Sequence, residues 1–175
     1  MPVRIRSGTM ARILHSFARA SALFLAVCFV APTAVADETI KIDRIEWVSG
    51  TRASAPSADA LWQSHTLPFR WPSSSGTRQG AWIRLKFDIP ETPVEGWGML
   101  LTRLPTGGTV YLNGRMVADL PLDSEQRHIR WRRPYLINLP VSFMQTNNDV
   151  LIYTSYGVGV HGIGPIDIGP TADLQ

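Results

Sequence analysis

Two short segments carry the residue types best suited to bind a small ligand. The first, Arg127–Arg133, holds four arginines, one histidine and one tryptophan within seven residues. Arg130 and Arg132 offer forked donors to carboxylates or phosphates, and Trp131 offers an apolar face to a sugar ring. The alternative interpretation is structural, because a strand entering a sheet can hold the same arginines solvated, stacked on tryptophan or paired with acidic side chains.

The second segment, Gly157-Val158-Gly159-Val160-His161-Gly162, matches the dinucleotide-binding pattern G-x-G-x-x-G. That pattern binds a pyrophosphate only where a helix follows, because the free N–H groups of the helix hold the phosphates. Residues 163–170 contain two prolines and two further glycines and cannot form that helix. We therefore expect no nucleotide cofactor. Gly157, Gly159 and His161 instead predict a ligand-binding loop at one end of a β-sandwich.

The sequence predicts neither an enzyme nor a metal centre. The histidines have no zinc-site spacing, and no G-x-S-x-G motif occurs. Asp119, Asp123 and Glu125 lie close together at a predicted turn, where solvated carboxylates are expected rather than the opposed pair of a glycosidase. The alternative for this turn is a calcium ion held by Asp123 and Glu125 together with backbone carbonyls.

The first 36 residues predict an export signal. A basic start is followed by the apolar run Ala20–Ala31 and then by small residues that predict cleavage after Ala36. The run is too short to span a membrane comfortably. Met10 is an alternative start, and Val27 argues against lipidation of Cys28 because a small residue is required there. We expect an exported, periplasmic protein.

The basic balance of the whole chain belongs to this leader. The chain has 17 basic and 14 acidic residues, with a sequence pI of about 9.4. The first 36 residues contain four of the basic residues and none of the acidic ones, so the rest carries 13 against 14, a net charge of −1. This argues against a nucleic-acid partner. The rest also lacks cysteine and any apolar stretch long enough to span a membrane, so membrane attachment is expected only if the chain is the front of a receptor.

Short alternating segments between turn formers predict an all-β domain of about eight antiparallel strands, a jelly-roll β-sandwich. In Trp82–Ile89 the odd-numbered residues are apolar and predict one buried face. Asn113-Gly114 predicts a two-residue hairpin turn of type I′. Residues 49–79 are expected to be irregular, with a helical turn near 58–63, and a second helical turn is expected within 140–145. The expected strands are residues 39–48, 82–89, 98–104, 109–112, 115–120, 134–139, 150–156 and 164–170.

The predicted organisation is a signal peptide over 1–36, then one β-sandwich domain. Within that domain, residues 37–79 form an N-terminal strand and the irregular segment, and residues 80–175 form the remainder. No internal repeat divides it.

The motifs, in this order, resemble a known family. They are Trp82-Ile83-Arg84-Leu85-Lys86-Phe87, Val110-Tyr111-Leu112-Asn113-Gly114, Arg130-Trp131-Arg132-Arg133-Pro134, Leu139-Pro140, Asn148-Asp149-Val150-Leu151-Ile152 and Ile163-Gly164-Pro165. This series resembles the periplasmic N-terminal sensor domain of membrane-bound bacterial histidine kinases, a galactose-binding-like jelly roll also present in seven-transmembrane diverse-intracellular-signalling receptors. It is similar, more distantly, to the sugar-binding domain of glycoside hydrolase family 2. The likeness covers about residues 40–170.

The resemblance implies a periplasmic ligand-binding or sensory module that is not catalytic by itself. Its ligand would be a sugar, a sugar acid or an anion, and its partner a membrane signalling protein. The alternative is a structural sandwich that docks onto another protein through exposed tryptophan and arginine, with no small ligand.

Overall fold

In the computed structural model the chain is described over residues 39–71, 79–93, 96–120, 134–156 and 162–175. All of these residues belong to one compact unit, Asp37–Gln175. Among them, no helix has the length and apolar character needed to cross a membrane. The predicted cleavage site after Ala36 lies outside the described residues and stays a prediction.

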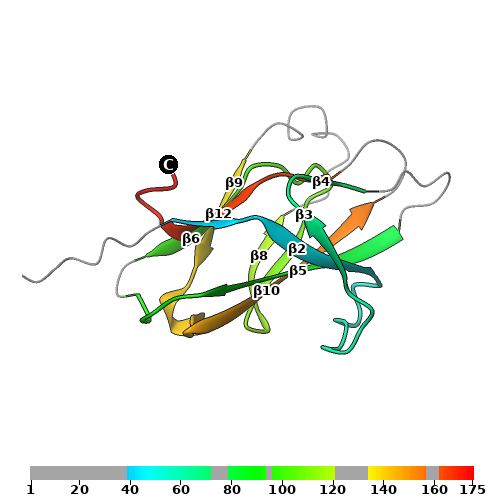
Figure 1. Cartoon of the computed structure of the whole chain (residues 1–175), viewed down its shortest axis with the longest axis horizontal. Helices are drawn as coiled ribbons and strands as arrows, with labels where there is room; N and C mark the ends of the chain where they lie inside the picture. Colours follow the sequence, from blue (N-terminus) through cyan, green and yellow to red (C-terminus); the bar gives the residue numbers. More distant parts are fainter. Residues whose placement is uncertain (1–38, 72–78, 94–95, 121–133, 157–161) are drawn as a thin grey trace, which may run out of the picture. The chain divides into compact units, whose positions relative to one another are not determined.

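The described residues form two main antiparallel sheets and one small one, and Figure 1 labels most of their strands. The four-stranded sheet consists, in spatial order, of β1 (Ile40–Ile42), β12 (Ile166–Pro170), β6 (Trp97–Leu101) and β9 (Tyr135–Leu139). The six-stranded sheet consists of β3 (Gln63–Thr66), β2 (Arg44–Ser49), β5 (Gln79–Asp88), β10 (Asn147–Tyr156), β7 (Gly108–Leu112) and β8 (Arg115–Leu120). The small sheet pairs β11 (Gly162–Ile163) with β4 (Phe69–Arg70).

The all-β sandwich predicted from the sequence is confirmed, but its strands are more numerous and partly elsewhere. The described residues contain twelve strands. The segment 49–79, predicted to be irregular, contains β3 and β4, whose few residues lack a clear alternation of apolar side chains. The expected strand 39–48 is divided at Asp43, and its halves β1 and β2 belong to different sheets. The helical turn expected within 140–145 is the 3₁₀ turn Val141–Phe143.

The apolar positions of both large sheets meet in one core. Strand β5 alternates as predicted, with Ile83, Leu85 and Phe87 in the core cluster. Its partner β10 lies antiparallel to it over ten residues, which places Ile152 opposite Ile83 and Val150 opposite Leu85. Because a strand directs successive side chains to opposite faces, this register leaves the even-numbered residues of β5 on the face turned away from the core.

The Asn113-Gly114 turn joins β7 to β8 as predicted. Asn113 has a φ of 50° and Gly114 a φ of 79°, the positive values that a type I′ turn requires. The Asn113 side chain also ties the turn to its surroundings: Nδ2 donates to the Phe143 carbonyl at 2.7 Å and to Asn148 Oδ1 at 3.0 Å. Its Oδ1 accepts from the Asp149 amide at 2.9 Å. The turn therefore fixes the start of β10 as well as its own hairpin.

We predict that the side-chain bonds of Asn113 matter more than its turn geometry. Asn113→Gly keeps the tolerance for positive φ and loses all three hydrogen bonds, which should lower the free energy of unfolding by about 2–3 kcal/mol. Gly114→Asn is the control, because Asn tolerates this φ and a Cβ at Gly114 meets no atom within 4 Å. Urea unfolding should show little change for the control, and equal losses in both variants would contradict the prediction.

Candidate functional site

All six residues predicted from the sequence to bind ligand lie outside the described residues. They are Arg130, Trp131, Arg132, Gly157, Gly159 and His161. The same holds for Asp123 and Glu125 of the alternative calcium site. These assignments therefore stay predictions.

The strand ends beside those segments lie at one end of the sandwich. Leu120, the last residue of β8, is opposite Gly108, and the neighbouring Thr109 is opposite Tyr153 near the end of β10. Segments 121–133 and 157–161 thus follow β8 and β10, the two strands that flank β7.

The described residues with the richest chemistry lie on the outer face of the six-stranded sheet, which we define as the face turned away from the core. Strand register arranges them in rows that cross the sheet. One row contains Val48, Trp82, Tyr153, Thr109 and Asp119. The next contains Ser64, Glu46, Arg84, Leu151, Tyr111 and Met116. A third contains Lys86 and Asp149, which are directly opposite each other.

The connection between β2 and β3 covers part of this face. We call residues 51–62 of this connection the strap. Trp82 Nε1 donates to the Thr51 carbonyl at 2.9 Å, and only 2% of Trp82 is exposed. Beneath the strap the Trp82 ring packs against Tyr153, with centroids 5.1 Å apart, and against Tyr111 at 5.8 Å. Trp82 faces away from the core, as its alternation predicts, yet it is buried because the strap shields it.

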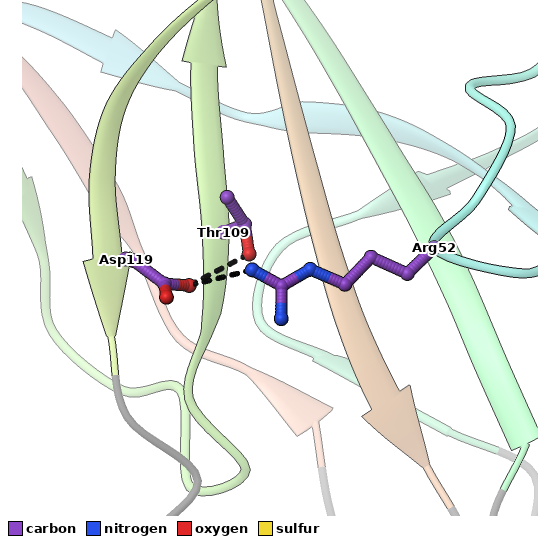
Figure 2. Close-up of polar contacts among 3 residues, drawn as sticks. All are labelled: Arg52, Thr109 and Asp119. Atoms are coloured by element: carbon purple, nitrogen blue, oxygen red, sulfur yellow. Dashed lines mark hydrogen bonds and ion pairs between the residues drawn. The ribbon is translucent and has the colours of Figure 1, made fainter.

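An ion pair links the first residues of the strap to β8, the edge strand at the opposite end of the sheet from β3. Figure 2 shows the Arg52 guanidinium reaching Asp119 on β8, with Nη2 3.1 Å from Oδ1. The same oxygen accepts from Thr109 Oγ1 at 2.8 Å. Asp119 was predicted to be a solvated carboxylate near a turn. It is instead a strand residue with two partners, although its side chain is still 56% exposed.

A second ion pair lies in the middle row and is much better shielded. Arg84 Nε donates to Glu46 Oε2 at 2.7 Å, and the Arg84 side chain is only 11% exposed. Trp62, the last residue of the strap, places its ring 4.2 Å from the Arg84 guanidinium carbon. Arginine stacks well on aromatic rings because its guanidinium is planar and weakly hydrated. Arg84 is therefore held between a carboxylate and an indole.

Asp149 is the unusual carboxylate of the outer face. Its backbone amide is bonded to Asn113, but its side chain has no hydrogen-bond or ion-pair partner among the described residues, and Oδ1 is closed to solvent. Burial raises the pKa of the Asp149 carboxyl above its ordinary value of 3.8. Arg84 and Lys86 counteract that rise, while Glu46 adds to it. Glu46 and Asp119 on the same face do have charged partners.

Potential metal ligands do not cluster in the described part of the chain. Within the described ranges, no group of three or more His, Cys, Asp or Glu side chains could hold a metal ion. The only described histidine, His65, accepts a hydrogen bond from Trp47 Nε1 at 2.8 Å and stacks on Phe69, with centroids 4.0 Å apart. His65 therefore packs within an aromatic cluster.

Sequence reasoning found only part of this face. The alternation of β5 placed Trp82, Arg84 and Lys86 together, but nothing local indicated that a strap would cover the first two. In the sequence, Asp149 is distinguished only as part of the strand motif Asn148-Asp149-Val150-Leu151-Ile152. Its isolation depends on cross-strand neighbours that a single sequence does not reveal.

The fold is shared with parts of glycoside hydrolases. A β-glycosidase from Bacteroides vulgatus matches with 17% identity and a TM-score of 0.56, over 75% of this chain and 20% of that one. A calcium-binding mutant of β-glucuronidase 2 from Bacteroides uniformis matches with 18% identity and a TM-score of 0.59, over 75% and 18%. A β-glucuronidase from Ruminococcus gnavus in complex with D-glucuronic acid matches with 11% identity and a TM-score of 0.59, over 76% and 29%.

These likenesses establish the β-sandwich fold and no more, because the identities are low. The chain matches less than a third of the length of each of these enzymes. The sequence matches no protein-family model and no curated protein. The galactose-binding-like fold expected from the sequence is supported, whereas the likeness to histidine-kinase sensors stays a prediction.

The two ion pairs of the outer face should differ in their contribution to stability. Arg84→Met removes a shielded, charge-assisted bond and should lower the free energy of unfolding by about 2 kcal/mol. Arg52→Met, the matched control, removes an exposed pair and should cost less than about 1 kcal/mol, with a smaller effect at high salt. Urea unfolding at two salt concentrations measures both, and equal losses would contradict this assignment.

Asp149 should make the stability of the protein depend on pH. Its folded-state pKa is raised, so the folded protein binds the proton more tightly than the unfolded chain does. Relative to Asp149→Asn, the wild type should therefore lose stability as the pH rises from the unfolded value of 3.8 through the folded-state pKa. Above that range the difference should be constant, with the Asn variant the more stable.

Thermal midpoints of the wild type and Asp149→Asn, measured from about pH 3 to 7, test this sign. Asp167→Asn is the control, because Asp167 lies on the four-stranded sheet opposite Lys41, as Asp149 lies opposite Lys86. A difference between wild type and Asp149→Asn that is the same at every pH would show that Asp149 titrates normally.

Proposed function

We propose that this chain is an exported, non-catalytic module that binds a small sugar-type ligand and thereby serves a sensory role. Two features support the proposal: the jelly-roll fold shared with parts of β-glycosidases, and the export signal predicted over residues 1–36. The observation that carries it is the outer face of the six-stranded sheet. There, aromatic rings, two ion pairs and an unpartnered carboxylate lie within three adjacent rows.

This combination is typical of sugar recognition for physical reasons. Ligand sites combine apolar surface with a few polar groups that fix orientation. The aromatic rings and Leu151 supply apolar surface, and Lys86 and Asp149 supply a donor and an acceptor. A histidine-kinase-like role would add a membrane signalling protein as partner, and the order of motifs from Trp82 to Pro165 is the support for that part of the proposal.

A second candidate function is docking onto another protein without any small ligand. It is favoured by three large apolar side chains that are exposed to solvent: Leu61 at 89%, Met116 at 59% and Leu136 at 41%. Leu61 is part of the strap and Met116 belongs to the edge strand β8, whereas Leu136 lies on the other sheet. Single exposed apolar residues are common on protein surfaces, so they weigh less than the outer face.

A thermal-shift screen of the purified protein against neutral sugars, sugar acids and inorganic anions separates the two functions. A ligand present at a hundred times its dissociation constant should stabilise the fold by about 2.7 kcal/mol. Light scattering over a range of protein concentrations provides the complementary measurement. No shift with any compound, together with self-association that increases with concentration, would favour the docking function instead.

A further inference from the structure

We propose that the outer face of the six-stranded sheet is the ligand site, and that it takes a neutral sugar whose hydroxyl groups donate to Asp149. This inference rests on the proposed function and deepens it, because it names both the place and the chemical class of ligand. It also differs from the sequence prediction, which placed the ligand at the end loop Gly157–Gly162.

The first support is the hydrogen-bonding state of Asp149. An ionised carboxylate has two oxygens and about four acceptor positions, and proteins rarely leave such a group partly buried and unbonded. No described side chain or backbone amide bonds to Oδ1 of this carboxylate, which is closed to solvent in the free protein, so a ligand hydroxyl reaches this oxygen only when the side chain turns. Glu46 and Asp119, on the same face, each have a charged partner. Asp149 therefore differs from these two carboxylates in having unused acceptor capacity.

The second support is that the buried, ionised carboxylate of Asp149 lowers the stability of the free protein. Burial disfavours the ionised form of Asp149 more than Arg84 and Lys86 favour it, which is why its pKa is raised. A group that lowers the stability of the free protein is characteristic of binding sites, where the ligand supplies the missing interactions. Structural carboxylates more often have partners that stabilise the charged form.

The charge balance around Asp149 selects the class of ligand. Four charged groups lie on neighbouring positions of β2, β5 and β10: Glu46, Arg84, Lys86 and Asp149. Their formal charges cancel, and the Arg84 guanidinium is already engaged by Glu46 and Trp62. Among these four groups no surplus positive charge therefore remains to attract a carboxylate or phosphate, and Asp149 would repel one. A ligand rich in hydroxyl donors and without charge fits this balance.

The neighbouring row offers apolar surface for the ring of such a ligand. Leu151 lies two residues beyond Asp149 on the same side of β10, and Tyr111 lies opposite Leu151 on β7. Both are half-buried, and the Tyr111 ring packs on Trp82 beneath the strap. The C–H face of a sugar can rest on Tyr111 and Leu151 while its hydroxyl groups reach Asp149 and Lys86. Apolar and polar groups are thus adjacent, as a sugar requires.

The test is calorimetric titration of the purified protein with lactose, cellobiose and maltose, and with D-glucuronate as the anionic counterpart. Binding of at least one neutral sugar is expected. Asp149→Asn should weaken it about tenfold, because a charge-assisted hydrogen bond becomes a neutral one, and Asp149→Ala should weaken it further. Asp167→Asn, the matched control on the other sheet, should leave the affinity unchanged.

Measuring the thermal midpoint of each variant distinguishes a loss of binding from a loss of folding. Asp149→Asn should raise the thermal midpoint while lowering the affinity, a pair of effects that a purely structural carboxylate would not produce. Unchanged affinity in both Asp149 variants overturns the site, above all if His161→Ala abolishes binding, which would place the ligand at the end loop. Preferential binding of D-glucuronate overturns the ligand class. If none of the four sugars binds the wild type, the inference fails together with the carbohydrate-binding function.

Discussion

The antiparallel pairing of β5 with β10 is the constraint on which the rest of the structure depends. Its ten residues lie at the centre of the six-stranded sheet, between β2 on one side and β7 on the other. Because side chains alternate along a strand, this one register decides which side chains enter the core and which lie outside. A shift of one residue would expose Ile83 and bury Lys86. The core and the outer face are therefore two results of the same alignment.

The outer face gains a partial second layer because the strap crosses it. Three shielded interactions there involve the strap or lie beneath it: Trp82 with Thr51, Arg84 with Glu46, and Trp62 with Arg84. Asp149 lies one row farther from Trp82 than Arg84 does, and its Oδ1 has no hydrogen-bond partner among the described residues. The strap thus stabilises the rows of Trp82 and Arg84, whereas Asp149 in the next row keeps an oxygen without a hydrogen bond.

How much the sequence could predict depends on whether the signal was local. The Asn113-Gly114 turn and the alternation of β5 are local, and both are confirmed. The division of residues 39–48 between two sheets, and the presence of β3 and β4 in a stretch rich in turn formers, depend on distant partners. The same limit applies to the candidate site: Asp149 looks like an ordinary strand residue until its neighbours on β5 and β7 are known.

The attachment of the strap has a consequence for how such a domain can diversify. Both of its ends are fixed by the pairing of β2 with β3, where Trp47 lies opposite Gln63. Closing a longer loop between two anchored strands costs little additional entropy, since the cost grows only with the logarithm of loop length. Insertions or deletions in this segment could therefore reshape the border of the outer face while both sheets keep their register. The two sheets would thus stay constant while the segment that borders the outer face varies.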